Sequence, residues 1–168
     1  IIFTMTNAIN PLNKKADFDA ATASGMMKKV FSGSDSSPAT HFAVVTGVHA
    51  ADVAATAKLG TVANVQVSDT IANAVMNLVN LKALSNARVN DIQLEGTAAQ
   101  IGTNFDKLNL IGKNLSTITA NDTGDITLSL AQYKAGAFNK IDVTGGAHIK
   151  LTNVGAADVK AVAANADI

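Results

Sequence analysis

The sequence of 168 residues contains no cysteine, and this absence excludes three kinds of chemistry. A disulfide scaffold, a thiol nucleophile and a thiolate metal site all need cysteine side chains. Tryptophan is also absent, and only 4% of the residues are aromatic. Because 48% of the residues are nonetheless apolar, we expect a folded chain with a core of valine, isoleucine, leucine and alanine. Such small side chains suit thin layers that stack regularly.

The sequence also lacks an excess of charge of either sign. Thirteen basic and thirteen acidic residues give a formal net charge of zero, so the charge pattern of a nucleic-acid or anionic-membrane binder is missing. Polar residues interrupt every apolar run well before the length that a membrane-spanning helix needs, and no such helix is predicted. The start, "IIFTMTNAINPLNKK", has neither an initiator methionine nor the pattern of a signal peptide. We therefore expect a piece of a longer protein that binds neither nucleic acid nor membranes.

What the sequence does contain is a near repetition of itself. The segment "TGVHAADVA" begins at Thr46 and "TNVGAADVK" begins at Thr152, a spacing of 106 residues. A shorter period lies between these two copies. When this part of the sequence is aligned with itself at one constant shift, apolar residues fall on apolar residues and a threonine falls on a threonine. The matched pairs are Val65 with Ile92, Val67 with Leu94, Thr70 with Thr97, Leu78 with Phe105, Leu81 with Leu108 and Leu84 with Ile111.

Each of these units combines two periodicities. The stretches "NVQVSDT" and "NDIQLEGT" alternate apolar and polar residues, which predicts strands with one buried face. Helical spacing of apolar residues follows, from Ile71 in one unit and from Ala98 in the next. Thr70 and Thr97 are placed to act as N-caps, and Asp69 adds negative charge at the helix start.

The C-terminal part has a related pattern. "STITANDTGDITLSL" predicts two strands around a turn at "NDTGD", and "AQYKAGAF" predicts a shorter helix. "NKIDVTGGAHIKLTNV" predicts a strand, a Gly-Gly turn and a strand, and "GAADVKAVAANA" predicts a last helix. Units of about 22 to 27 residues fall within the period range that is typical of solenoids.

We therefore expect an α/β repeat solenoid over residues 41–168, which would resemble a leucine-rich repeat or a β-helix. Short parallel strands would stack on one side and helices on the other, with Ala54, Ala57 and Ala161 letting the layers approach closely. An ordinary two-layer α/β domain is the alternative. Residues 1–40 do not follow the repeat, and we expect them to form an N-terminal cap or a diverged unit, with Met26 and Met27 in its core.

The segments "VQVSDTIANAVMNLVNLKAL", "NDTGDITLSLAQYKAGAF" and "VTGVHAADVAATAK" resemble a repeat of very large secreted or surface-attached bacterial proteins. The resemblance covers residues from about 42 to 168 and implies an adhesin-like or surface-layer-like array outside the cell that continues beyond Ile168 in a longer protein. Such proteins often carry the calcium-binding nonapeptide "GGxGxDxxx". Here "TGGAHIK" has the glycines without the aspartate, so no motif supports calcium or another cofactor.

No pattern of a catalytic or metal site is found in the sequence. His41, His49 and His148 show no metal-ligand spacing, and no phosphate loop or nucleophile elbow occurs. Asp122 and Asp125 in "NDTGD" supply too few oxygens for Ca²⁺. A β-turn is the favoured interpretation of that segment.

Capping and turn formation account for two further carboxylates, Asp69 and Asp91, which we expect at strand ends. We therefore name no catalytic, cofactor or metal residue.

Three functions follow as hypotheses. The first is a non-enzymatic structural or adhesive segment of the bacterial surface that associates with itself or with neighbouring repeats. The second is a module that binds polysaccharide or another ligand, although Tyr133 is the only tyrosine available as an aromatic platform. The third, an enzyme on a β-helix, would need carboxylates clustered on successive strands. The aligned strand positions are instead apolar, threonine or asparagine.

Overall fold

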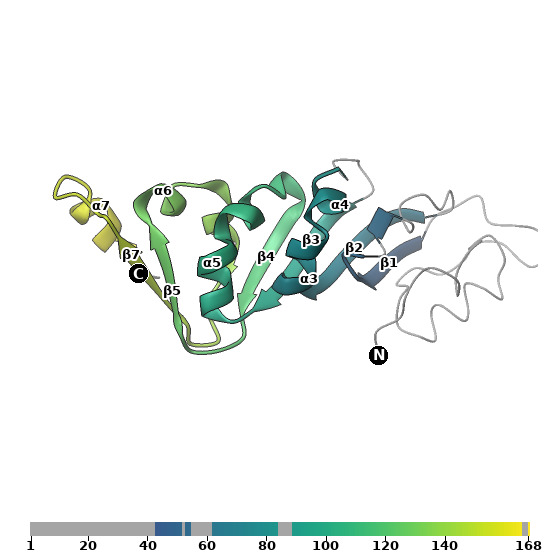
Figure 1. Cartoon of the computed structure of the whole chain (residues 1–168), viewed down its shortest axis with the longest axis horizontal. Coiled ribbons are helices and arrows are strands. Elements are labelled where there is room, and N and C mark those ends of the chain that lie inside the picture. Colours follow the sequence, from purple (N-terminus) through teal and green to yellow (C-terminus); the bar gives the residue numbers. More distant parts are fainter. Residues whose placement is uncertain (1–42, 52, 55–61, 84–88, 166–167) are drawn as a thin grey trace, which may run out of the picture.

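The computed structural model describes residues 43–51, 53–54, 62–83, 89–165 and 168. Their fold is mixed α/β and is built around a parallel sheet of five strands in the order β1-β2-β3-β4-β6 (Figure 1). These strands are Ala43–Val48, Val62–Thr70, Val89–Gly96, Leu115–Ala120 and Ile141–Asp142. The expected parallel sheet is confirmed. Residues 1–40, with Met26 and Met27, lie outside the described residues, as does His41.

A second, smaller sheet lies beyond the first in the C-terminal part. It consists of β5 (Asp125–Ser129) and β7 (His148–Thr152), which also run parallel. The strands on either side of the "NDTGD" turn, β4 and β5, are therefore not partners of each other. Each pairs instead with a strand of a neighbouring unit, β4 with β3 and β6, and β5 with β7.

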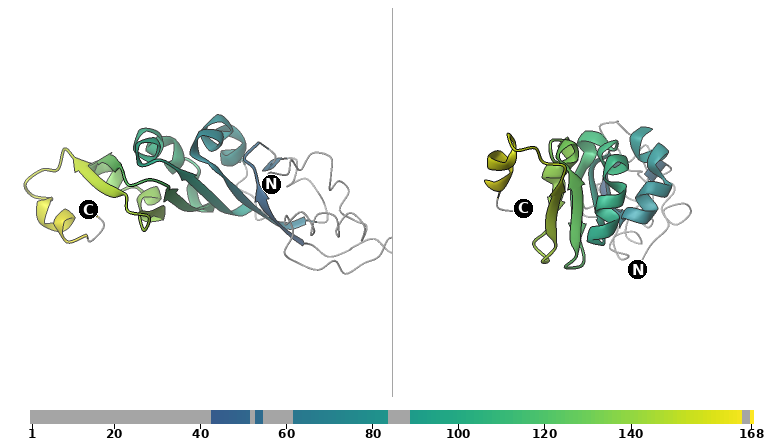
Figure 2. Two further views of the ribbon diagram at one scale, coloured as in Figure 1. Left: turned by 90° about the horizontal axis from the view of Figure 1, so that it is seen from below. Right: turned by 60° about the vertical axis from the view of Figure 1, so that its left-hand side comes forward.

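Helices lie on one side of the main sheet in the N-terminal part of the molecule (Figure 2). They are α3 (Ile71–Met76), α4 (Leu78–Ala83) and α5 (Ala98–Asn109). The predicted N-caps are confirmed, because the side chain of Thr70 accepts a hydrogen bond from the Asn73 amide at 3.2 Å and that of Thr97 from the Gln100 amide at 3.1 Å.

The helix predicted from Ile71 is interrupted at Asn77, which separates α3 from α4. The Asn77 side chain donates a hydrogen bond to the Asn73 carbonyl at 2.9 Å. An asparagine side chain that bonds to the backbone in this way competes with the hydrogen bonds of a continuous helix. A hydrophobic stripe shows the helix face but does not reveal such a break.

The prediction that helices cover the whole side opposite the sheet is wrong for the C-terminal part. There β5 continues the layer of α3 and α5, and β7 follows it. Helix α5 contacts β5 closely, since a Cβ atom on Gly102 would lie 2.9 Å from the Thr127 carbonyl oxygen. The short helix α6 (Leu130–Tyr133) and the 3-10 turns η1 (Gly112–Asn114) and η2 (Gly136–Lys140) connect the layers, and the short helix α7 (Val159–Ala163) follows β7.

Neighbouring strands are staggered relative to the sequence repeat. Val67 pairs with Ile92 in the sheet, whereas the sequence alignment places Val67 on Leu94. The stagger of two positions leaves the same residues on the buried face, because every second side chain of a strand points to the same face of the sheet. The predicted inward positions Val65, Val67, Ile92 and Leu94 are accordingly all buried.

The core is one apolar cluster between the two layers, with Phe105, Ile101 and Leu108 of α5 fully buried at its centre. Ala161 was expected to lie where two layers approach each other, but it is exposed. Ala54 is partly buried. Ala57 and Leu84 are outside the described residues. Within the described segments, no helix combines the length and apolar character needed to cross a membrane.

Candidate functional site

Carboxylates at the ends of the strands connect one unit to the preceding one. Asp69, at the end of β2, accepts a hydrogen bond from the Ala50 amide at 2.8 Å, across 19 residues of sequence. Its second oxygen accepts from the Thr70 amide at 2.7 Å and the Asn73 side chain at 2.9 Å. The expected capping role of Asp69 is confirmed, and the carboxylate also holds the neighbouring unit.

Asp122 makes the same kind of contact two units later. Its carboxylate accepts a hydrogen bond from the Ala98 amide at 2.8 Å, at the first residue of α5. Negative charge is stabilising at this end of a helix because the first amides have no partner within the helix. Asp125 is exposed at the start of β5 and does not share this contact. The "NDTGD" segment therefore places one carboxylate in a structural contact and leaves the other facing solvent.

Further polar side chains also connect consecutive units. The Gln132 side chain donates to Asp106 at 3.0 Å, and the Ala137 amide donates to the Asn109 side chain at 3.1 Å. Asp91 lies inside β3, so its predicted position at a strand end is wrong. It accepts hydrogen bonds from the Ser116 hydroxyl of β4 and from the Gln93 side chain. Among the described residues, polar side chains thus add several hydrogen bonds between neighbouring units to those made within a unit.

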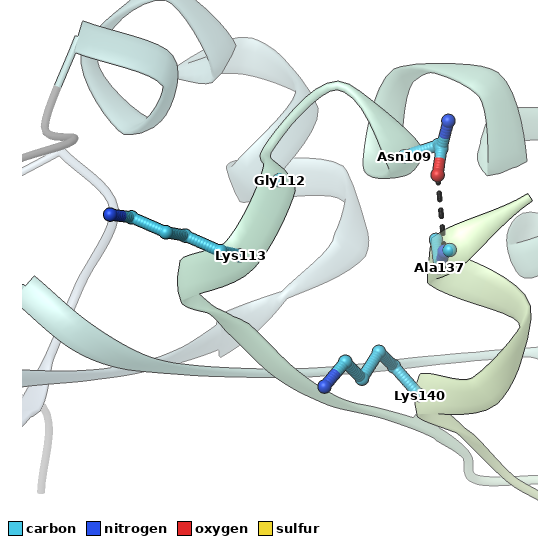
Figure 3. Close-up of a pocket in the computed structure, with 6 residues that line it drawn as sticks. Asn109, Gly112, Lys113, Ala137 and Lys140 are labelled. Atoms are coloured by element: carbon cyan, nitrogen blue, oxygen red, sulfur yellow. Dashed lines mark hydrogen bonds between the residues drawn. The ribbon is translucent and has the colours of Figure 1, made fainter.

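A cavity among the described residues lies where α5, η1 and η2 meet (Figure 3). It has a volume of about 250 Å³ and is lined by Asn109, Gly112, Lys113, Gly136, Ala137 and Lys140. Gly112 adopts a positive φ of 83°, which lets the chain turn directly from α5 into η1. We call this the two-lysine pocket. Pockets for drug-sized ligands are usually larger than this, so a monosaccharide-sized group fits better.

The charge of the two-lysine pocket is positive. Lys113 and Lys140 come from consecutive 3-10 turns, and neither forms an ion pair with a carboxylate of the described residues. The sequence reasoning missed both lysines. Each lies shortly after a glycine, but nothing in the local pattern indicates that η1 and η2 line the same pocket.

Two shallower hollows contain the sequence candidates. One, of about 220 Å³, is lined by His49, Ser68, Asp69, Thr70 and Glu95. The other, of about 320 Å³, is lined by Ala99, Gly102, Thr103, Asp125 and Thr127. His148 lies elsewhere, exposed on β7. Within the described part of the chain, no three His, Asp or Glu side chains lie close enough together to hold a metal ion.

Two remaining side chains have defined surroundings. Tyr133 is half-buried and forms a T-shaped contact with Phe138, with ring centroids 4.7 Å apart. Hydrogen bonds from the Thr144 hydroxyl at 2.6 Å and amide at 2.9 Å lower the pKa of Asp142 below its ordinary value. This pair closes the turn between β6 and β7.

The fold and the contacts between units define the chain as an α/β protein with a parallel sheet. Comparison with known protein families, with curated proteins and with solved structures gave no match.

Proposed function

We propose that the chain is a non-enzymatic structural segment of a bacterial extracellular or cell-surface protein, built as a strand–helix solenoid that associates with itself or with neighbouring repeats. The observation that carries this proposal is the order of contacts along the chain. In each sheet a strand pairs with the strand of the next unit, and side-chain hydrogen bonds join residues 19 to 28 positions apart. Stacking of this kind is how repeat proteins build long particles.

The arrangement in space is consistent with this proposal. The strands β1, β2, β3, β4, β5 and β7, and then helix α7, follow one another along the longest axis of the molecule (Figure 1). Length in such a protein grows with the number of units, which suits a spacer, a coat or a filament. The assignment to a bacterial surface array comes from the sequence resemblance to repeats of large secreted bacterial proteins.

Small-angle scattering combined with size-exclusion chromatography and light scattering tests the proposal. We expect an elongated particle whose mass increases with concentration, because stacked units expose strand edges that promote lengthwise association. A compact monomer at every concentration would argue against the proposal.

A second candidate is a module that binds anionic polysaccharide. The two-lysine pocket favours it, since two cationic side chains border a hollow of about 250 Å³. Titration with an acidic and a neutral polysaccharide, using the intact chain and a Lys113→Gln/Lys140→Gln double variant, tests this candidate. Binding of the acidic polymer that weakens at high salt and in the double variant would support it. Equal behaviour of the two chains would exclude the pocket as the site.

A further inference from the structure

Two segments that match in sequence also match in backbone conformation. Gly47 has a φ of 68° and Asn153 a φ of 58°, and they occupy the same position in "TGVHAADVA" and "TNVGAADVK". A positive φ is uncommon for a residue with a side chain, and Asn153 is the one such residue outside glycine in the described part of the chain. The matching residues Val53 and Val159 are both helical. The segments are therefore two copies of one structural element.

The two copies differ sharply in burial. In the first copy Val48, Ala50 and Val53 are all 0% exposed. At the matching positions of the second copy Val154 is half-buried and Ala156 is exposed. Val159 is 52% exposed. Identical apolar residues are thus covered in one copy and open in the other. We call the surface of β7, Val154, Ala156 and Val159 the open face.

The structure shows one partner of the first copy. Strand β2, which follows that copy in the chain, pairs in parallel with β1, with Val67 opposite Val48. At the end of β2 the carboxylate of Asp69 accepts a hydrogen bond from the Ala50 amide at 2.8 Å. The second copy has no counterpart of this strand in the described residues, because β7 is hydrogen-bonded to β5 alone.

We propose that the open face is the docking site for a further strand–helix unit of the Val62–Met76 type, which follows α7 in the same polypeptide. Its strand pairs in parallel with the free edge of β7. Its aspartate, at the position that corresponds to Asp69, accepts a hydrogen bond from the Ala156 amide. In the first copy, the pairing strand β2 comes next in the chain. A unit that follows the second copy in the chain pairs with it in the same way. This inference rests on the proposed function, since it identifies the partner that a stacked segment needs.

An extended chain tests the inference. The sequence of residues 63–83 is added after Ile168, so that Ile168 takes the place that Val62 has in the earlier copy. Amide hydrogen exchange is then compared between the extended and the original chain. We expect exchange at Leu151, Val154 and Ala156 to slow by roughly tenfold or more, because a paired strand protects the amides that it covers. Exchange in β2 of the parent part reports that the parent fold is intact.

Two substitutions in the added segment serve as a matched pair. Asp→Asn at the position equivalent to Asp69 removes the charged acceptor and should restore most of the fast exchange at Ala156. Ser→Asn at the preceding position, equivalent to the exposed Ser68, should leave the protection in place. Equal protection in both variants would contradict the proposed role of the carboxylate.

Three other outcomes would overturn the inference. Unchanged exchange would mean that the open face does not accept this unit. Protection of β6 in place of β7 would mean that the added strand joins the other sheet. The same protection in concentrated unextended chains would assign the face to a second copy. Each outcome can be distinguished from a failure of the proposed function. A chain that binds a different strand at this end still forms an elongated particle in the scattering test.

Discussion

The carboxylate of Asp122 accepts a hydrogen bond from the backbone amide of Ala98 at 2.8 Å, although the two residues are 24 positions apart in sequence. The contact satisfies an amide at the start of α5 with an acceptor from the turn that follows β4. Asp69 makes the equivalent contact with Ala50 in an earlier unit. Each aspartate therefore joins the strand end of one unit to the backbone of the preceding part of the chain, in addition to the hydrogen bonds of the sheet.

Removal of the Asp122 carboxylate should destabilise the fold. Asp122→Ala leaves the partly buried Ala98 amide without its charged acceptor, which we expect to lower the free energy of unfolding by about 1–3 kcal/mol. Urea denaturation followed by circular dichroism provides the measurement. Asp125→Ala in the same turn is the matched control, because Asp125 is exposed, and it should change stability by no more than about 0.5 kcal/mol. Equal effects of the two substitutions would contradict the structural role of Asp122.

The contact between α5 and β5 should not tolerate a larger residue at position 102. Alanine favours a helix interior over glycine by about 1 kcal/mol, yet a Cβ at Gly102 would lie 2.9 Å from the Thr127 carbonyl oxygen. We expect Gly102→Ala to be destabilising by about 1–3 kcal/mol, because backbone must shift to relieve the overlap. Thermal unfolding measures the effect.

A second glycine distinguishes steric overlap from a general effect of alanine. A Cβ at Gly136 would meet no atom within 4 Å, so Gly136→Ala should be neutral or stabilising by up to about 1 kcal/mol. A stabilising effect of Gly102→Ala would show that α5 and β5 do not approach each other this closely.

Phe105 should contribute more to stability than any other single side chain of α5. It is fully buried and is the largest of the fully buried side chains. Phe105→Ala should lower the free energy of unfolding by about 3–5 kcal/mol, through lost burial and the cavity that remains. Leu110→Ala, at a residue that is 54% exposed, should cost much less. A small effect at Phe105 in chemical denaturation would indicate a core that does not close around α5.

The turn between β6 and β7 should show a dependence on pH. Hydrogen bonds from the Thr144 hydroxyl and amide lower the pKa of Asp142 from the ordinary value of 3.8. The ionised form is thus favoured in the folded state. Its contribution to stability is fully present above pH 3.8 and is lost as the pH falls through the lowered pKa. Carboxyl chemical shifts in an NMR titration measure this pKa.

Substitution of the hydroxyl partner tests the cause of the shift. Thr144→Ala removes the Thr144 hydroxyl donor and keeps the amide donor, so the pKa of Asp142 should rise part of the way towards 3.8. Thr103→Ala, in the exposed part of α5, should leave it unchanged. A pKa of Asp142 that does not respond to loss of the Thr144 hydroxyl would refute this assignment.

Several features of the fold could be predicted because they depend on short-range patterns. Alternation in "NVQVSDT" and "NDIQLEGT" predicted the buried faces of β2 and β3, and Thr70 and Thr97 were predicted as N-caps. The two-lysine pocket could not be predicted in this way. Lys113 and Lys140 belong to different units of the sequence, and only the tertiary structure brings them to one pocket.

By itself, the sequence determined where the main strands lie, where α3 and α5 begin, which of their faces turn inward and where the two copies of the "AADV" element lie. These properties follow from side-chain periodicity and from hydrogen bonds within a few residues. Only the tertiary structure decided that β5 lies beside α5, that Asp122 reaches Ala98 and that the second copy keeps an open face. Such relationships depend on the path of the chain between units, and periodicity specifies the face of a segment without specifying its neighbour.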